Sequence, residues 1–182
     1  MTRSSAAGPP DLVNGQIPPG RWVCSVEQAE TAYIKGQSGD REEIWGQWLR
    51  LTAALQKVLG EIPACWLSGS LFTDKADPND IDCLYIVDTA KYNEALGGDP
   101  KVAQLVNAAT EGRVKDLYGL RIDSYILEWM PTPGPVPTAE TRQYLWKRGY
   151  WDDLWSRIRS DDPRLDSIPR RGYLEVIIDG YR

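Results

Sequence analysis

Two aspartates that lie one residue apart, Asp80 and Asp82, stand at the start of an apolar run that ends at Val87. The run predicts a β-strand, and because side chains alternate across a strand, both carboxylates should point to one face with their Cα atoms about 6.5–7 Å apart. Unpaired carboxylates at this spacing repel each other and resist burial, whereas Mg²⁺ or Mn²⁺ takes oxygen ligands and leaves room for substrate phosphates. The pair therefore predicts a divalent-cation site.

A Gly-Ser pair, Gly69 and Ser70, precedes Asp80 with nine residues between them. The stretch 66–87 is typical of a strand that ends in a tight turn, followed by a polar loop and a second strand. Gly69 has no Cβ, so a phosphate could approach the backbone closely, and Ser70 adds a hydroxyl. The spacing of the turn to the aspartates makes the two features one motif.

Gly-Ser, a short variable loop and Asp-x-Asp at the start of a strand resemble the DNA-polymerase-β-like nucleotidyltransferase superfamily, especially its minimal members. The resemblance implies a third carboxylate on a neighbouring strand, at Asp123 in the predicted strand 120–129. It also implies a helix start directly after the Gly-Ser turn, where backbone N–H groups would hold nucleotide phosphates. More loosely, residues 17–21, 73–75 and 169–178 resemble a prokaryotic and viral branch of that superfamily.

The residues that would contact a nucleotide in this interpretation are Gly69, Ser70, Lys75, Arg170 and Arg171. The two arginines precede the terminal strand 172–178, where they would either clamp a triphosphate or act as a solvated device that discourages aggregation at a sheet edge. Asp123 also has two interpretations, because a charge in an apolar strand lies at a solvated edge or pairs with a cation. Arg121, on the same face of that strand, is a rival to a metal as the cation.

The elements that position these residues alternate along the chain. A long helix is predicted from Asp40 to Gly60, with Asp40 and Glu43 as a capping box and an apolar stripe that should cover the sheet. Shorter helices are expected over 23–35, capped by Ser25 and Gln28, and over 89–97, 100–111, 138–148 and 151–159. With strands at 64–67, 80–87, 120–129 and 172–178, the predicted fold class is α/β (α+β). It is a mixed sheet of about four to five strands flanked by helices, which the resemblance makes nucleotidyltransferase-like.

The length of 182 residues and the 42% of hydrophobic residues predict a single domain, residues 21–182. Residues 1–20 are expected to form a flexible or surface-laid N-terminal arm. Four prolines in 131–137 predict an extended connector, followed by a helical C-terminal extension, 138–182, that ends in a strand. The aromatic-rich segment 144–155 resembles a base-stacking surface, but its nearly balanced charges favour core and partner packing.

Composition excludes several mechanisms. The chain has no histidine, which excludes Ser-His-Asp hydrolysis, His-based ribonuclease chemistry and His-liganded zinc or iron. The cysteines, Cys24, Cys65 and Cys83, include no C-x-x-C pair, so neither a zinc knuckle nor a disulfide framework is indicated. The net charge of −5 argues against a broad cationic surface for nucleic acid. With no membrane-length apolar run and no signal peptide, a cytoplasmic location is expected.

The resemblance predicts a magnesium-dependent nucleotidyltransferase that moves a nucleoside monophosphate from an NTP to a hydroxyl acceptor. Asp80, Asp82 and Asp123 would hold two Mg²⁺ ions (or Mn²⁺) and carry the catalysis, and Asp123 would assist deprotonation of the acceptor. The acceptor would be a protein side chain, a small molecule or tRNA, and a toxin–antitoxin or phage-defence setting with a partner protein fits such enzymes. The alternative is a non-catalytic module that uses the same fold to bind a nucleotide or to neutralise a partner.

Overall fold

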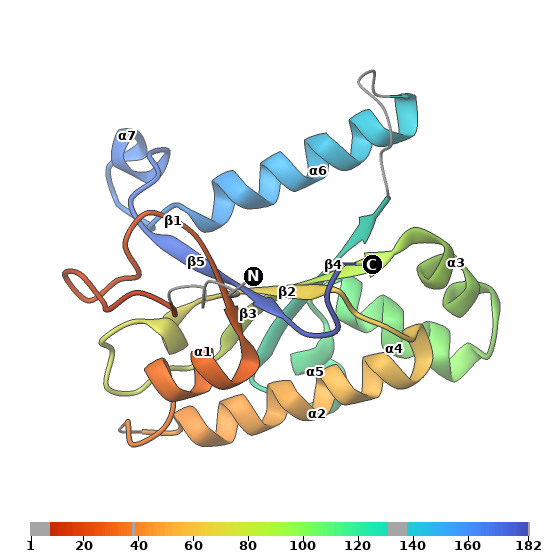
Figure 1. The fold of residues 1–182 in the computed structure, drawn as a ribbon, viewed down its shortest axis with the longest axis horizontal. Helices are drawn as coiled ribbons and strands as arrows, with labels where there is room; N and C mark the ends of the chain where they lie inside the picture. The colour runs from red at the N-terminus through yellow and green to blue at the C-terminus, as the bar shows by residue number, and fades with distance from the viewer. Residues whose placement is uncertain (1–7, 38, 131–137, 182) are drawn as a thin grey trace, which may run out of the picture.

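The computed structural model describes residues 8–37, 39–130 and 138–181. Five strands form one mixed sheet in the order β1-β5-β2-β3-β4. Strand β2 is antiparallel to β3 and β5, whereas β1 is parallel to β5 and β4 is parallel to β3. The strands are β1 (Gly20–Ser25), β2 (Ala64–Ser68), β3 (Ile81–Asp88), β4 (Ile122–Trp129) and β5 (Gly172–Ile177). Helices lie on both faces of this sheet (Figure 1), so the predicted mixed α/β fold class is confirmed.

One face of the sheet carries the helices of the N-terminal and middle parts of the chain (Figure 1). They are α1 (Val26–Tyr33), α2 (Arg41–Leu59), α3 (Thr89–Gly97), α4 (Pro100–Thr110) and α5 (Val114–Tyr118). The predicted apolar stripe of α2 is buried at Ile44, Trp48, Leu51 and Leu55. These side chains belong to the main core, which also includes the strand residues Cys65, Leu67, Cys83, Tyr85, Leu174 and Val176.

The two predicted capping boxes have different outcomes. At α1 the box is confirmed, because Ser25 accepts from the backbone N–H of Gln28 and the Gln28 side chain accepts from that of Ser25. At α2 the prediction is wrong, since Asp40 stands at the N-cap without a side-chain cap bond. Its Oδ2 instead accepts from Arg121 Nη1 at 2.6 Å.

The opposite face of the sheet is covered by α6 (Ala139–Trp155), one continuous helix where two segments were predicted. A second core forms beneath it from the buried residues Ala64, Trp66, Leu84, Ile86, Leu127, Tyr144, Trp155 and Tyr173. Tyr144 and Trp155 thus pack inward, as expected, whereas Trp146 is 71% exposed. A short helix, α7 (Pro163–Asp166), connects α6 to β5. Among the helices of the described ranges, none combines the length and apolar character that crossing a membrane requires.

Strand β1 is absent from the predicted elements, and the helix expected from Val23 begins only at Val26. The difference arises because residues 20–25 pair in parallel with β5, more than 140 positions away. Residues 8–19 lie along the domain, with Ile17 buried and its carbonyl accepting from Gly172 N at 2.7 Å. The first seven residues of the expected arm and the proline-rich connector 131–137 lie outside the described residues.

Candidate metal centre

The three predicted carboxylates come together at the start of two parallel strands. Asp80 directly precedes β3, and Asp82, within β3, is in register with Asp123 of β4. Because residues in register share a face, the side chains of Asp82 and Asp123 both lie on the α6 side of the sheet. One carboxylate oxygen from each of Asp80, Asp82 and Asp123 lies within 4.8 Å of the others. The sequence therefore identified the members of this acidic cluster.

Burial and mutual repulsion make this cluster electrostatically costly. The pKa of Asp82 is raised to about 6, first by desolvation and then by the charge of Asp80, with a further contribution from Asp123. The pKa of Asp123 is also raised, again mainly by burial and then by Asp80. A divalent cation would remove both causes, since it replaces lost hydration and offsets like charges. The all-oxygen donor set fits Mg²⁺ or Mn²⁺.

Gly69 lies against the Asp82 carboxylate, and any residue with a Cβ at this position would force neighbouring atoms to move. Its φ is +95°, a conformation that side chains disfavour, and a Cβ there would lie 2.8 Å from Asp82 Oδ2. A single 3₁₀ turn, η1 (Ser70–Phe72), follows it in place of the helix start that the resemblance implied. Ser70 Oγ accepts from Asn79 N at 3.2 Å, which ties the two ends of the loop together beside the cluster.

Arg121 is not the rival partner of Asp123 that its strand position suggested. Its guanidinium donates to the carbonyls of Asn79 at 2.6 Å and Pro78 at 2.5 Å, and it pairs with Asp40. Arg121 therefore anchors the loop that leads into Asp80, and Asp123 is left to the acidic cluster.

The structure separates the predicted arginine pair. Arg171 is close enough to Asp82 that its charge lowers the Asp82 pKa, and its Nε donates to Trp155 O at 3.1 Å. Burial in turn lowers the pKa of Arg171. Arg170 Nη2 instead donates to the carbonyl of Ile158 at 2.5 Å. Lys75 is exposed on the loop, with its backbone carbonyl bonded to Arg41. Only Arg171 of these three basic residues acts electrostatically on the cluster.

The sequence analysis did not predict that two further basic residues, Arg159 and Lys115, lie near the acidic cluster. The exposed Arg159 also lowers the pKa of Asp82. Lys115, in α5, places its Nζ 3.1 Å from Asp80 Oδ2, and this contact raises the pKa of the lysine. Gly119, in the left-handed conformation at the end of α5, was a sequence signal for that helix. Nothing in the sequence, however, pairs positions 115 and 80.

Lys115→Met is expected to tighten Mg²⁺ binding about two- to fivefold, because it removes a partly exposed cation that competes for Asp80. Calorimetric titration of the metal into both proteins measures the change. Lys91→Met is the matched control, since Lys91 pairs with Glu94 on α3 and should leave the affinity unaltered. Weaker binding by the Lys115 variant would mean that the lysine supports the cluster instead of competing for it.

The fold and the site together define a mixed α/β domain with a carboxylate cluster at the start of two parallel strands. The chain belongs to the protein family described as a family of unknown function (DUF6932), whose profile matches residues 10–177. No curated protein and no solved structure matches it.

Proposed function

We propose that this protein is a magnesium-dependent nucleotidyltransferase, related to the DNA-polymerase-β-like superfamily, that moves a nucleoside monophosphate from an NTP to a hydroxyl acceptor. The observation that carries the proposal is the convergence of Asp80, Asp82 and Asp123 to within 4.8 Å beside the Gly69 turn. A partly buried, mutually repelling set of carboxylates destabilises a domain unless it has a cation to hold. The fit of this oxygen set to Mg²⁺ supports a phosphoryl-transfer site.

Each group in the site has a role in this reaction. The three aspartates would hold Mg²⁺ (or Mn²⁺), which when bound lowers the pKa of a hydroxyl and neutralises phosphate charge. Arg171 and Arg159 supply positive charge for the triphosphate on the side of Asp82. Asp123 would take a proton from the acceptor hydroxyl, since the chain has no histidine to act as general base.

The net charge of the chain indicates which class of acceptor is favoured. A net charge of −5 disfavours long nucleic acid, so a hydroxyl on a protein side chain or a small molecule is the preferred acceptor and tRNA the less favoured one. A cytoplasmic enzyme that modifies a partner protein would suit a toxin–antitoxin or phage-defence pair.

The test is transfer of label. The purified protein is incubated with Mg²⁺, each α-labelled NTP in turn and a lysate of the source organism, and label is followed on polypeptides, RNA and small molecules. We expect one NTP to give a labelled product that disappears with EDTA. Absence of both label and NTP binding would refute the proposal.

The Lys115–Asp80 ion pair favours a second candidate, a non-catalytic module that binds nucleotide on the same site. An internal cation already balances part of the acidic cluster, so the fold does not depend on a metal for all of its charge compensation. Calorimetry with NTP separates the two functions. Binding of Mg²⁺–NTP without consumption of the nucleotide would support the module, whereas turnover supports the enzyme.

A further inference from the structure

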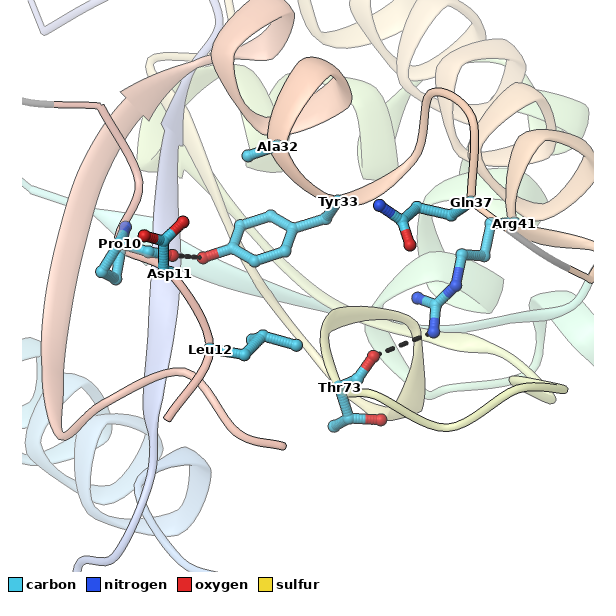
Figure 2. Close-up of a pocket in the computed structure, with 8 residues that line it drawn as sticks. All are labelled: Pro10, Asp11, Leu12, Ala32, Tyr33, Gln37, Arg41 and Thr73. Atoms are coloured by element: carbon cyan, nitrogen blue, oxygen red, sulfur yellow. Dashed lines mark hydrogen bonds between the residues drawn. The ribbon is translucent and has the colours of Figure 1, made fainter. Parts of the chain in front are cut away.

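A cavity of about 230 Å³ lies apart from the acidic cluster, between the N-terminal segment, the end of α1, the first residue of α2 and the loop after Gly69. Figure 2 shows its lining, with Arg41 and Gln37 at one end, Asp11 at the other, and the ring of Tyr33 and Leu12 between them. Three stretches of the chain, residues 10–12, residues 32–41 and Thr73, thus meet around one small space.

The charge of Arg41 is buried at one end of this cavity. The residue is only 5% exposed, and its guanidinium donates to the carbonyls of Leu71, of Thr73 at 2.9 Å and of Lys75 at 2.6 Å. A guanidinium has five N–H groups, and among the described residues no carboxylate lies within ion-pair distance of this one. Its charge is therefore stabilised by carbonyl dipoles and by the more distant charge of Asp74, without a direct ion pair, which suits an added anionic group.

The other end of the cavity has the opposite charge. Asp11 is exposed, so its carboxyl group is accessible to a ligand cation. The Tyr33 hydroxyl is tied to Pro10 O at 2.5 Å, which fixes the ring that forms the middle of the wall. A cation at one end, a carboxylate at the other and an apolar wall between them match a zwitterion with a short apolar body.

Size narrows the ligand further. A water molecule occupies about 30 Å³ in the liquid, so the cavity holds on the order of eight waters, or a molecule of roughly ten heavy atoms. Nucleotides are too large for this space. We propose that the cavity binds a free α-amino acid, with its carboxylate toward Arg41 and Gln37, its ammonium group toward Asp11 and its side chain against Tyr33 and Leu12.

Occupancy would act on the neighbouring loop. Arg41 holds three carbonyls of the loop that joins Gly69 to Asp80, and Thr73 of the same loop lines the cavity. A ligand on Arg41 would therefore restrain residues 71–75 together with α1 and the N-terminal segment. Slower amide hydrogen exchange in 71–75 is the expected signature.

The experiment is a thermal-shift screen of the purified full chain against each of the 20 L-amino acids, followed by calorimetry of the best ligand. That amino acid should bind, while its carboxamide and its N-acetyl derivative should each bind at least about tenfold more weakly, because each lacks one charge. A screen without any binder, or equal binding of the free and blocked forms, would overturn the proposal.

Variants locate the site without disturbing Arg41, whose loss could unfold the loop. Asp11→Asn and Gln37→Leu change exposed side chains and should each weaken binding, the first by roughly tenfold or more. Glu27→Gln alters an exposed carboxylate of α1 outside the cavity and should bind as the parent does. Unchanged binding by Asp11→Asn would place the ligand elsewhere. None of these measurements uses an NTP, so their outcome is independent of the proposed transfer reaction.

Discussion

Asp82→Asn is expected to abolish the proposed transfer reaction and, at the same time, to make the metal-free protein more stable at neutral pH. Loss of a carboxylate ligand removes several kcal/mol of charge stabilisation from the transition state, so the rate should fall on the order of 10³-fold or more. Asp80→Asn should have a similar effect on transfer. The assay is the labelled-NTP reaction, with Asp77→Asn, an exposed aspartate of the same loop, as the matched control.

The stability effect has a defined pH dependence. The pKa of Asp82 rises from 3.8 to about 6 on folding, so the folded state binds its proton more tightly than the unfolded chain does. The stability that this proton provides is fully present below pH 4 and is lost as the pH rises through 6. Since each tenfold change in proton affinity corresponds to about 1.4 kcal/mol, ionised Asp82 costs the metal-free protein on the order of 3 kcal/mol.

Urea unfolding in EDTA at two pH values measures this cost. The Asn variant should be more stable than the parent at pH 7.5 by up to about 3 kcal/mol and equal to it near pH 4, where Asp82 is protonated. Added Mg²⁺ should stabilise the parent and not the variant. If the variant loses stability at pH 7.5 and still transfers label, Asp82 is neither a strained charge nor a metal ligand.

Arg171→Met should lower kcat/KM for the NTP about 10- to 100-fold, because it removes a charge-assisted contact to the triphosphate. Removal of this guanidinium also takes away the main attraction that opposes the rise in the Asp82 pKa. The Mg²⁺ affinity of the variant should therefore decline more steeply than that of the parent as the pH falls through 6 to 7. Steady-state kinetics and metal titrations over this range give both readouts.

Arg170→Met is the matched control for this variant. The guanidinium of each arginine donates a hydrogen bond to a backbone carbonyl near the end of α6. Arg171 donates to Trp155, and Arg170 donates to Ile158. Only Arg171 influences Asp82. Arg171→Lys should restore part of the lost activity, because it keeps the charge and loses the fork geometry. An equal fall in kcat/KM in the two Met variants would mean that Arg171 only stabilises the local backbone and does not contact the triphosphate.

The fold could be predicted where local signals agree with the final packing. The α2 stripe and strands β2 to β5 are defined by apolar periodicity, and the structure confirms them. Strand β1 was missed because its polar flanks give no alternation signal and its partner is remote in sequence. The helical segments expected over 138–148 and 151–159 form one helix that runs through Gly149 and ends at Trp155, since inward packing of Trp155 and the half-buried Trp151 outweighs a glycine cost of about 1 kcal/mol.

The candidate site, like the fold, could be predicted where it depends on local strand alternation. Alternation placed Asp82 and Asp123 on definite strand faces, so the acidic cluster needed only the correct neighbouring strand. The bonds of Arg121 and Lys115 could not be predicted, because each joins loop or helix residues to partners 35 to 81 positions away. Arg170 and Arg171 precede β5, where strand alternation does not yet fix side-chain direction. The sequence therefore could not predict that the two side chains bind at different places.

Strand β5 follows every other strand along the sequence, yet it lies between β1 and β2. On the ribosome, β1 and β2 are therefore made before the strand with which both pair. Their hydrogen bonds to β5 can form only after residue 177 has been translated. Arg171, just before β5, reaches Asp82 in that same late step. The nascent polypeptide thus carries all three carboxylates of its acidic cluster without this counter-charge from the translation of Asp123 to that of Arg171, and the arginine arrives together with the strand that closes the sheet.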